Sequence, residues 1–174
     1  AYRALLKQRA QRGAVDFETT ETQIVCDESG RIEKIVPRTR TEAHKLIEEC
    51  MLAANVCAAE FITAGEHPSL FRVHEGPTPE KRLILQGYLK ALGIGLHLSD
   101  DPAPGEYQAI AQATQDRPDA TQIHTMLLRS MQQAIYTGAN GGHFGLAYPA
   151  YTHFTSPIRR YPDLLVHRVI KALL

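Results

Sequence analysis

The residues best suited to chemistry in this sequence lie in one short segment, Tyr151–Asp163, which reads YTHFTSPIRRYPD. The segment combines hydroxyl groups, aromatic rings and two adjacent arginines, and an apolar run at helical spacing follows it. Pro157 fits the first turn of a helix, because the N–H group that proline lacks would be unsatisfied there in any case. Thr155 or Ser156 is then the natural N-cap. The pattern therefore predicts a helix that begins at Pro157.

The start of such a helix is suited to hold an anion, and phosphate is the favoured one. Free N–H groups, hydroxyls and two guanidinium groups would all face the same ligand. In the structural alternative, Arg159 and Arg160 pair with Asp163 and the hydroxyls only cap the helix. Two arginines alone would favour that alternative. The aromatic rings and three hydroxyls on the same segment favour the phosphate site instead.

The same segment resembles the signature of the RNB family, the ribonuclease II and ribonuclease R type of 3′-to-5′ exoribonuclease. Further blocks resemble the ribonuclease R type and occur in the same order as in that type, so the resemblance extends through nearly the whole chain. These blocks are Arg12–Phe17, Leu46–Met51, Phe71–His74 and Thr125–Ser130. The resemblance implies that residues 1–174 are the C-terminal portion of an RNB catalytic domain. It also implies that the N-terminal metal-binding part and the flanking RNA-binding β-barrels are absent.

The resemblance places site roles on individual residues. Arg159, not Arg160, matches the family's catalytic arginine, and a planar guanidinium can bridge two phosphate oxygens, which lysine cannot. Thr155 and Ser156 match residues that position the RNA backbone. Glu48 matches a ribose contact, with Glu49 as the alternative. The other RNA-binding residues expected in the signature segment are Tyr151, His153 and Arg160.

Phe17 is a further candidate, because it opens a hairpin beside Arg12. A core position and a role in stacking on a base are equally favoured for its ring.

The activity that the resemblance implies is processive, Mg²⁺-dependent hydrolysis of single-stranded RNA from its 3′ end to nucleoside 5′-monophosphates. Two Mg²⁺ ions need a cluster of carboxylates, and the sequence lacks a convincing one: Asp100-Asp101 lies in a proline-rich loop and Glu48-Glu49 is a single pair. The family's metal-binding aspartates belong to an earlier part of the domain. We therefore assign no metal ligand here and expect the isolated chain to be inactive.

Two other functions remain open. In the first, the chain is a non-catalytic RNA-binding module that keeps Arg159 as a clamp on phosphate. In the second, it is a structural half of a domain and completes its fold only with another chain. A missing N-terminal half would expose apolar surface, so a homodimer or strand exchange is a further expectation.

Composition limits the remaining possibilities. Lys plus Arg and Asp plus Glu number 19 each, so there is no global basic field and any RNA contact must come from a local cluster. Cys26, Cys50 and Cys57 are predicted to be small buried hydrophobes in a reducing compartment. No apolar run approaches the length of a membrane span, and the N-terminus lacks the pattern of a signal peptide. We expect a cytoplasmic protein with no membrane partner.

The elements that must position these residues follow from periodicity. A central helix is predicted over 39–64, with Thr39 and Glu42 at capping-box spacing and one wide apolar stripe. A hairpin is predicted around Asp27–Gly30. Further predictions are an extended run over 69–73, helices over 2–11, 80–92, 107–114 and about 119–136, and a strand over 143–147. The fold class is therefore α+β, with helices packed on a small, mainly antiparallel sheet.

Overall fold

The computed structural model describes residues 2–15, 22–37 and 41–174. Phe17, predicted as an RNA contact, and Thr39, predicted as a helix cap, lie outside these residues. Helices and small antiparallel sheets alternate along the described chain, which confirms the predicted α+β class. The helices are α1 (Tyr2–Arg12), α2 (Glu42–Ala64), α3 (Pro79–Ala91), α4 (Pro104–Thr114), α5 (Ala120–Ser130) and α6 (Tyr161–Leu173). The strands are β1 (Thr22–Cys26), β2 (Ile32–Pro37), β3 (Phe71–Val73) and β4 (Ile135–Thr137).

The described strands form two separate two-stranded sheets, where the sequence predicted one. β1 and β2 form the predicted hairpin, with Thr22 opposite Pro37. The Asp27 carboxylate accepts hydrogen bonds from the backbone N–H groups of Ser29 and Arg31, at 2.9 and 3.0 Å, and so closes the turn. β3 pairs with β4, which lies more than sixty residues further along the chain. The pairing of β3 and β4 therefore ties distant segments together.

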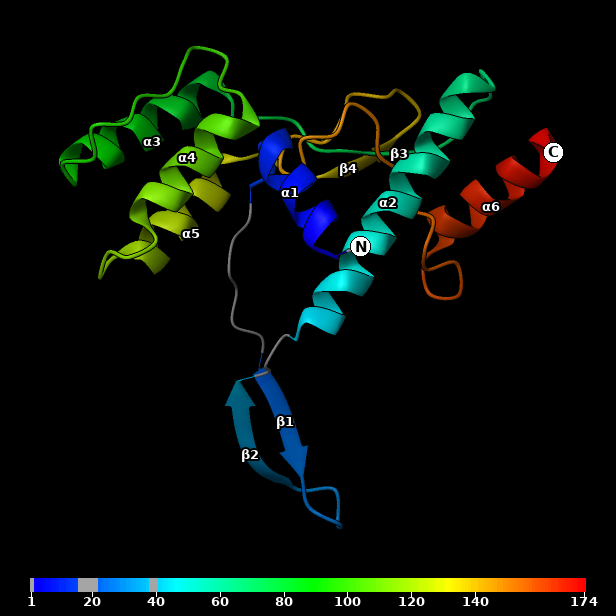
Figure 1. Ribbon diagram of the computed structural model, residues 1–174, viewed down its shortest axis with the longest axis horizontal. Coiled ribbons are helices and arrows are strands. Elements are labelled where there is room, and N and C mark those ends of the chain that lie inside the picture. The colour runs from blue at the N-terminus through cyan, green and yellow to red at the C-terminus, as the bar shows by residue number, and fades with distance from the viewer. Residues whose placement is uncertain (1, 16–21, 38–40) are drawn as a thin grey trace.

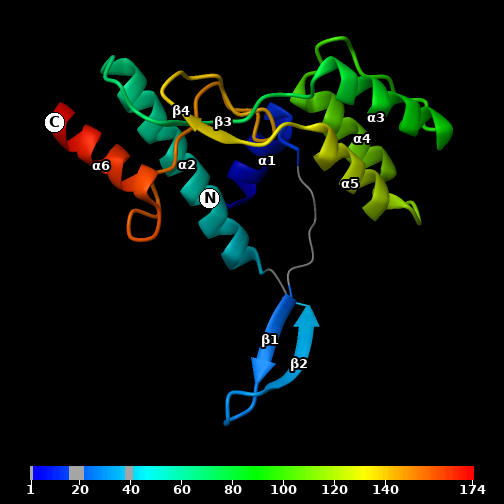
Figure 2. The ribbon, with the colours of Figure 1, turned by 180° about the vertical axis from the view of Figure 1, so that it is seen from behind.

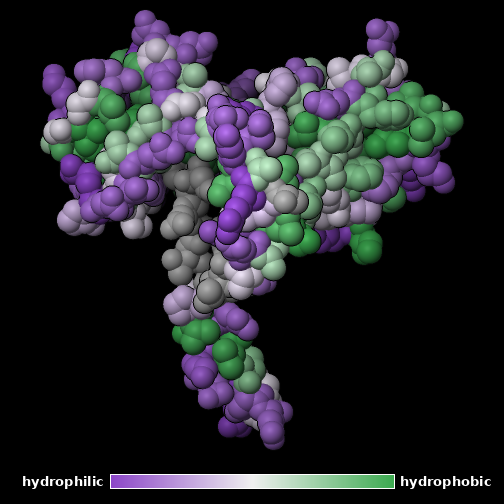
Figure 3. Space-filling model, in the orientation of Figure 1, coloured by the Kyte–Doolittle hydropathy of each residue, from purple (hydrophilic) through white to green (hydrophobic). Residues whose placement is uncertain are grey.

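The β1–β2 hairpin extends away from the other described elements (Figures 1 and 2). Three of its isoleucines, Ile24, Ile32 and Ile35, are 55%, 62% and 62% exposed. The space-filling view shows apolar residues on the surface of this arm (Figure 3). The hairpin thus has no described element packed on either face.

One hydrophobic core lies among α3, α4 and α5, at the left of Figure 1. α3 was predicted to turn Leu83 and Ile84 inward, but these side chains are 60% and 57% exposed. Leu85 and Leu89 are buried instead, because they lie on the side of α3 that packs against α5. The core consists of Val15, Leu85, Leu89, Ile94, Leu98, Tyr107, Ile110, Ala111, Ile123, Leu127 and Met131.

A second core joins α2, α6 and β3. Its buried members are Ala58, Ala59, Ile62, Phe71, Val73, Ala150 and Val166. α2 begins one turn later than predicted. Thr41 is its N-cap, and the Thr41 hydroxyl accepts a hydrogen bond from the His44 N–H group at 3.4 Å.

Part of the apolar stripe predicted on α2 faces outward. Ile47 and Phe61 are 59% and 42% exposed. Cys26, Cys50 and Cys57 are all exposed, so their predicted burial is wrong. The helix packs chiefly against α1 and α6, and burial follows those contacts and not the width of the stripe.

Two further boundaries differ from prediction. α5 ends at Ser130, and Ile135–Thr137 leaves the predicted helix to become β4. In place of the strand predicted over 143–147, His143 forms isolated β-bridges and residues 144–147 form a turn, with Ala147 at a positive φ of 54°. Among the described residues, no helix is long and apolar enough to cross a membrane.

Candidate functional site

The signature segment is a loop over residues 151–160, and α6 begins only at Tyr161. The prediction that the helix starts at Pro157 is therefore wrong, and so is the predicted cap at Thr155 or Ser156. A helix that began at Pro157 would place Pro162 in its second turn, where proline lacks the needed N–H and clashes with the preceding turn. Pro162 instead occupies the first turn of α6. Pro157 to Arg159 form a separate turn, closed by the Arg160 N–H group donating to the Ser156 carbonyl at 3.0 Å.

Hydrogen bonds from neighbouring elements hold the first part of this loop. The Arg72 N–H group of β3 donates to the Tyr151 carbonyl at 2.8 Å. Thr152, which is 1% exposed, donates from its hydroxyl to the Leu70 carbonyl at 2.6 Å. Asn55 of α2 contacts three residues of the loop, Tyr151, Phe154 and Thr155. The loop therefore has a defined path without helix or strand geometry.

The two arginines of the loop have different environments. Arg160 donates to the Asp163 carboxylate at 2.8 Å, and Asp163 has no exposed side-chain surface. The same carboxylate oxygen accepts the Ser156 N–H group at 2.8 Å. Arg159 is exposed and donates to the Ser156 hydroxyl at 3.3 Å. The structural alternative considered from sequence thus applies to Arg160 and not to Arg159.

A pocket of about 280 Å³ lies beside the loop. It is bounded by α1, α2, the turn at Leu146 and the signature segment. Five of the residues predicted to bind RNA are among those that line it: Glu48, Tyr151, His153, Thr155 and Arg160. Arg159 and Ser156 do not line the pocket but lie on the adjoining turn.

The two adjacent glutamates of α2 differ in burial and in surroundings. Glu49 is 5% exposed, and Arg9 of α1 donates to its carboxylate at 2.7 Å. Glu48 is less buried and lines the pocket. Glu48 lines the pocket and Glu49 does not, so Glu48 is the one of the two carboxylates that a ligand in the pocket can reach.

Residues of both charges line the pocket, since Arg9, Arg160 and Glu48 are all among them. Burial, followed by the charge of Arg160, lowers the pKa of His153 to about 4, although Asp163 acts in the opposite direction. The more distant charges of Arg72 and Arg159 lower this pKa further. His153 is therefore neutral at physiological pH, and the Tyr136 hydroxyl lies 2.6 Å from its Nδ1. Burial also raises the pKa of Tyr151, whose ring is 5% exposed.

The signature segment carries buried polar atoms that line the pocket region and lack a hydrogen-bond partner among the described residues. The Thr155 hydroxyl oxygen and Arg160 Nε are such atoms. Buried polar atoms without partners are uncommon in folded proteins and each needs an explanation. Atoms of this kind beside a pocket are suited to a polar ligand.

Metal ligation was also considered. Within the described ranges, no group of three or more His, Cys, Asp or Glu side chains lies close enough together to hold a metal ion. The residues of the signature segment supply one carboxylate, Asp163, and Ser156 and Arg160 already bond to it. The described residues therefore do not fit a Mg²⁺ site.

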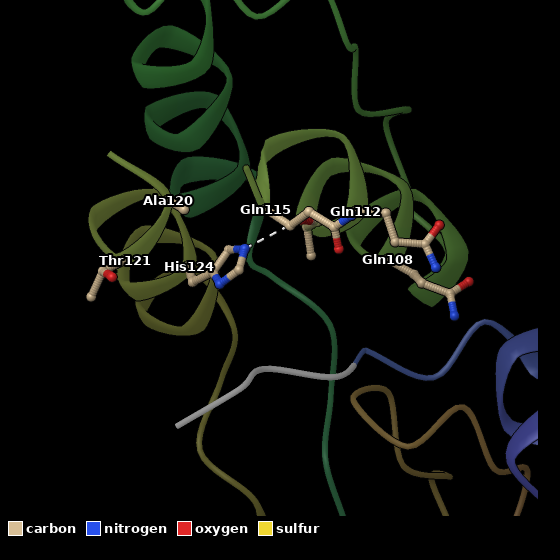
Figure 4. Close-up of a pocket in the computed structure, with 7 residues that line it drawn as sticks. Gln108, Gln112, Gln115, Ala120, Thr121 and His124 are labelled. Carbon is tan, nitrogen blue, oxygen red and sulfur yellow. Dashed lines mark hydrogen bonds between the residues drawn. The ribbon is translucent and has the colours of Figure 1, made fainter. Parts of the chain in front are cut away.

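Two other hollows contain none of the predicted site residues. One, of about 800 Å³, is lined by residues that include Arg12, His74, His143 and Tyr148. His74 is held by two backbone groups, the Gln132 carbonyl at 2.8 Å and the Gly145 N–H at 3.1 Å. The other, of about 400 Å³, lies between α4 and α5 and is lined by three glutamines and His124 (Figure 4).

Asn55 is a residue of this site to which the sequence analysis assigned no role. It follows Glu48 by seven positions, and this spacing places both residues on the same face of α2. The signal was an asparagine within a long run of apolar and small residues, and such a residue, where buried, needs partners. The structure shows it 3% exposed and hydrogen-bonded to the loop.

Comparison with known proteins defines the class. The sequence matches the RNB domain family over residues 1–174. The chain therefore belongs to the RNB family. Ribonuclease R of Escherichia coli strain K12 is 49% identical over 173 residues, which are 99% of this chain and 21% of that protein. The chain thus spans about a fifth of the length of this curated relative.

Solved structures agree with this assignment. Mycoplasma genitalium RNase R, in complex with ribose methylated single-stranded RNA, superposes with a TM-score of 0.89 at 32% identity. The match covers 97% of this chain and 27% of that one. Yeast Ssd1, described as a pseudonuclease, superposes with a TM-score of 0.67 at 28% identity, over 78% of this chain and 17% of its own.

Proposed function

We propose that this chain is the C-terminal portion of the catalytic domain of a 3′-to-5′ exoribonuclease, and that it holds the 3′ end of single-stranded RNA. The observation that supports this proposal most is the gathering of Glu48, His153, Thr155 and Arg160 around one pocket, with Arg159 on the adjoining turn. The Mycoplasma relative, which is solved with RNA, supports RNA as the ligand. A cytoplasmic location stays a prediction.

In this proposal Arg159 clamps the phosphate beside the bond that is hydrolysed. Its side chain is exposed and forms no ion pair with a described residue, so its donors can reach a phosphate from solvent. A guanidinium can contact two phosphate oxygens at once and neutralise the charge that develops on them. Arg160 contributes mainly its positive field, because Asp163 already accepts a bond from it.

Glu48 and the hydroxyls of the loop hold the nucleotide. A carboxylate that accepts a bond from a ribose 2′-OH distinguishes RNA from DNA. Thr155, whose hydroxyl oxygen has no partner among the described residues, can donate to the RNA backbone. Ser156 is placed to orient Arg159, since its hydroxyl accepts from that guanidinium. Phe17, Tyr151 and His153 stay predicted RNA contacts.

Arg159 is proposed to clamp the leaving group as well as the phosphate, and activation of water is assigned to other parts of a longer protein. Mg²⁺ would supply this chemistry, and the described residues contain no cluster that fits it. Release of nucleoside 5′-monophosphates and processive action belong to the same proposal.

A segment replacement tests the proposal. This chain would substitute for the matched residues of Escherichia coli ribonuclease R, and the chimaera would be assayed on 5′-labelled single-stranded RNA with Mg²⁺. We expect hydrolysis from the 3′ end by the chimaera, and RNA binding without hydrolysis by the isolated chain. Clear Mg²⁺-dependent activity that follows the isolated chain through purification would contradict the proposal that the metal ligands lie elsewhere.

A non-catalytic RNA-binding or structural module is the second candidate. The likeness to yeast Ssd1, a pseudonuclease, favours it. In that case the chimaera folds and binds RNA but does not release nucleotides, while the unmodified relative does. If neither the isolated chain nor the chimaera binds RNA, an RNA-binding role is excluded and only the structural role remains.

Self-association is a separate part of the proposal. The three exposed isoleucines of the β1–β2 hairpin supply an apolar surface for a second copy or for strand exchange. Light scattering across a range of concentrations measures this directly. A constant monomer mass would reject it.

A further inference from the structure

We propose that Asn55, a buried residue of α2, is a positioning residue for the RNA site. It sets the path of the loop that carries Thr155 and leads into the Arg159 turn. The inference rests on the proposed function, since it assigns the loop a role in holding RNA.

The contacts of Asn55 use both ends of its amide. Its Nδ2 group donates to the Tyr151 hydroxyl at 2.8 Å. Its Oδ1 atom accepts the backbone N–H groups of Phe154 and Thr155, at 2.9 and 3.2 Å. A carbonyl oxygen has two lone pairs, so both are in use. No residue with a single polar atom can make this set of contacts.

The loop depends on these contacts because it lacks the regular backbone hydrogen bonds of a helix or a strand. In a helix or strand the N–H groups of Phe154 and Thr155 would bond to other backbone groups. Here a side chain from a different element accepts both. Removing that acceptor leaves two partly buried N–H groups unpaired, which is costly unless the loop shifts to meet water. The predicted consequence is therefore movement of the loop.

α6 holds the same loop from the other side. The Asp163 carboxylate accepts the Ser156 N–H group, and the His167 ring lies 2.9 Å from the Phe154 carbonyl through its Nε2 atom. Asn55 adds a hydrogen-bonded tie to α2, the helix that also carries Glu48. This tie fixes the ribose contact and the phosphate contacts relative to each other.

An aromatic stack steadies the partner of Asn55. The Tyr151 ring is parallel to Tyr148, with an interplanar angle of 4° and centroids 6.0 Å apart. The Arg12 guanidinium lies 3.8 Å from the centroid of the Tyr148 ring. These contacts hold the Tyr151 ring in place. The hydrogen bond between the Tyr151 hydroxyl and Asn55 then keeps the side-chain amide of Asn55 in a single orientation.

Hydrogen exchange on the 174-residue chain, without RNA, is the first measurement. We expect Asn55→Ala to raise the exchange rates of the Phe154 and Thr155 amides by about tenfold or more, while amides in α4 and α5 keep theirs. Asn55→Asp should preserve most of the protection, because a carboxylate also accepts both N–H groups and can accept from the Tyr151 hydroxyl. Unchanged exchange in Asn55→Ala would overturn the proposal.

Turnover in the chimaera is the second measurement. Asn55→Ala should lower kcat by about tenfold or more, because a small displacement of a catalytic group is enough for this. KM should change by less than about threefold. Thr114→Ala is the matched control, since Thr114 is 1% exposed and its hydroxyl donates within α4, to the carbonyls of Ile110 and Ala111. Equal losses of kcat in the two variants would reduce Asn55 to a residue of general stability.

Tyr151→Phe is a milder variant that tests the proposal even if Asn55→Ala does not fold. It removes one of the three bonds, and we expect a smaller increase in exchange at the same two amides. Arg159→Ala in the chimaera separates the two proposals. If Arg159→Ala has no effect on turnover, the proposed function fails; if it abolishes turnover while folded Asn55→Ala keeps full activity, only the role of Asn55 fails.

Discussion

Arg160 and Asp163 form a buried ion pair, with 2.8 Å between Nη2 and Oδ1, and this pair fixes the end of the signature loop against the first turn of α6. Asp163 has no exposed side-chain surface, and its Oδ1 atom also accepts the Ser156 N–H group. The aspartate therefore reaches back across the turn that carries Arg159. The Arg160 guanidinium is therefore bonded within the protein, whereas the neighbouring Arg159 guanidinium is exposed and can contact a ligand.

The first prediction concerns the stability that this pair provides. Asp163→Asn removes the carboxylate charge and leaves the Arg160 guanidinium without its partner. Breaking a buried pair on one side costs several kcal/mol, and because Arg160 is 23% exposed we expect the lower end, about 3 kcal/mol. Urea unfolding of the 174-residue chain measures the change. A loss below about 1 kcal/mol would show that solvent screens the pair.

The position of Asp163 also shows what sequence patterns could predict here. The residue types of the signature segment identified the family, because chemistry of this kind is carried by residue identity, and the segment supplies Tyr151, His153, Thr155 and Arg160 to the lining of the pocket. They did not locate the start of α6. The segment contains two prolines, Pro157 and Pro162, that each fit a first helical turn, and only the course of the chain after the loop separates them.

Burial on α2 was the less predictable part. The apolar stripe fixed the helix and its end near Gly65, but Ile47 and Cys57 are exposed while Glu49 and Asn55 are buried. Periodicity reports which residues share a face. It does not report that Arg9 of α1 and the loop from residue 151 supply the polar partners that make burial of a glutamate and an asparagine favourable. Both partners are distant in sequence.

A second prediction separates the two glutamates of α2. Glu48→Gln should narrow the preference for RNA over DNA, because an amide is a weaker acceptor for a ribose 2′-OH than a carboxylate. Competition between oligonucleotides that differ only in their 3′-terminal sugar measures this preference. Glu49→Gln is the control: it should leave the preference unchanged and lower the unfolding free energy by about 1 kcal/mol, since it replaces the carboxylate that pairs with Arg9 by a weaker, neutral acceptor. The opposite pattern would move the ribose contact to Glu49.

A third prediction follows from the buried histidines. Burial, then the neighbouring His74, lowers the pKa of His143 to about 3. Unfolded histidine binds its proton near pH 6.5, so between these values the unfolded chain carries more protons than the folded one. The resulting stability is complete above about pH 6.5 and is lost as the pH falls toward the folded pKa. Unfolding between about pH 5 and 7 tests this above the range in which most carboxylates titrate.

His143→Gln should flatten that pH dependence by up to about 1 kcal/mol per pH unit. His97→Gln, at an exposed histidine, is the matched control and should leave the slope as it is. The comparison uses slopes, so a uniform loss of stability in either variant does not affect it. If His143→Gln keeps the full slope, the acid sensitivity comes from other groups, with His153 the next to replace.

The last prediction concerns the arginine that remains at the surface. Arg159→Lys in the chimaera keeps the charge but removes the planar fork, so one phosphate oxygen loses its partner. If the second contact forms mainly in the transition state, turnover falls by about tenfold or more while RNA affinity changes little. Single-turnover hydrolysis and fluorescence anisotropy measure the two quantities separately. Arg168→Lys, on the exposed surface of α6, is the control for loss of an arginine in general. Equal losses of affinity and turnover would instead make Arg159 a simple anchor for the RNA backbone, which would fit a binding module as well as a nuclease.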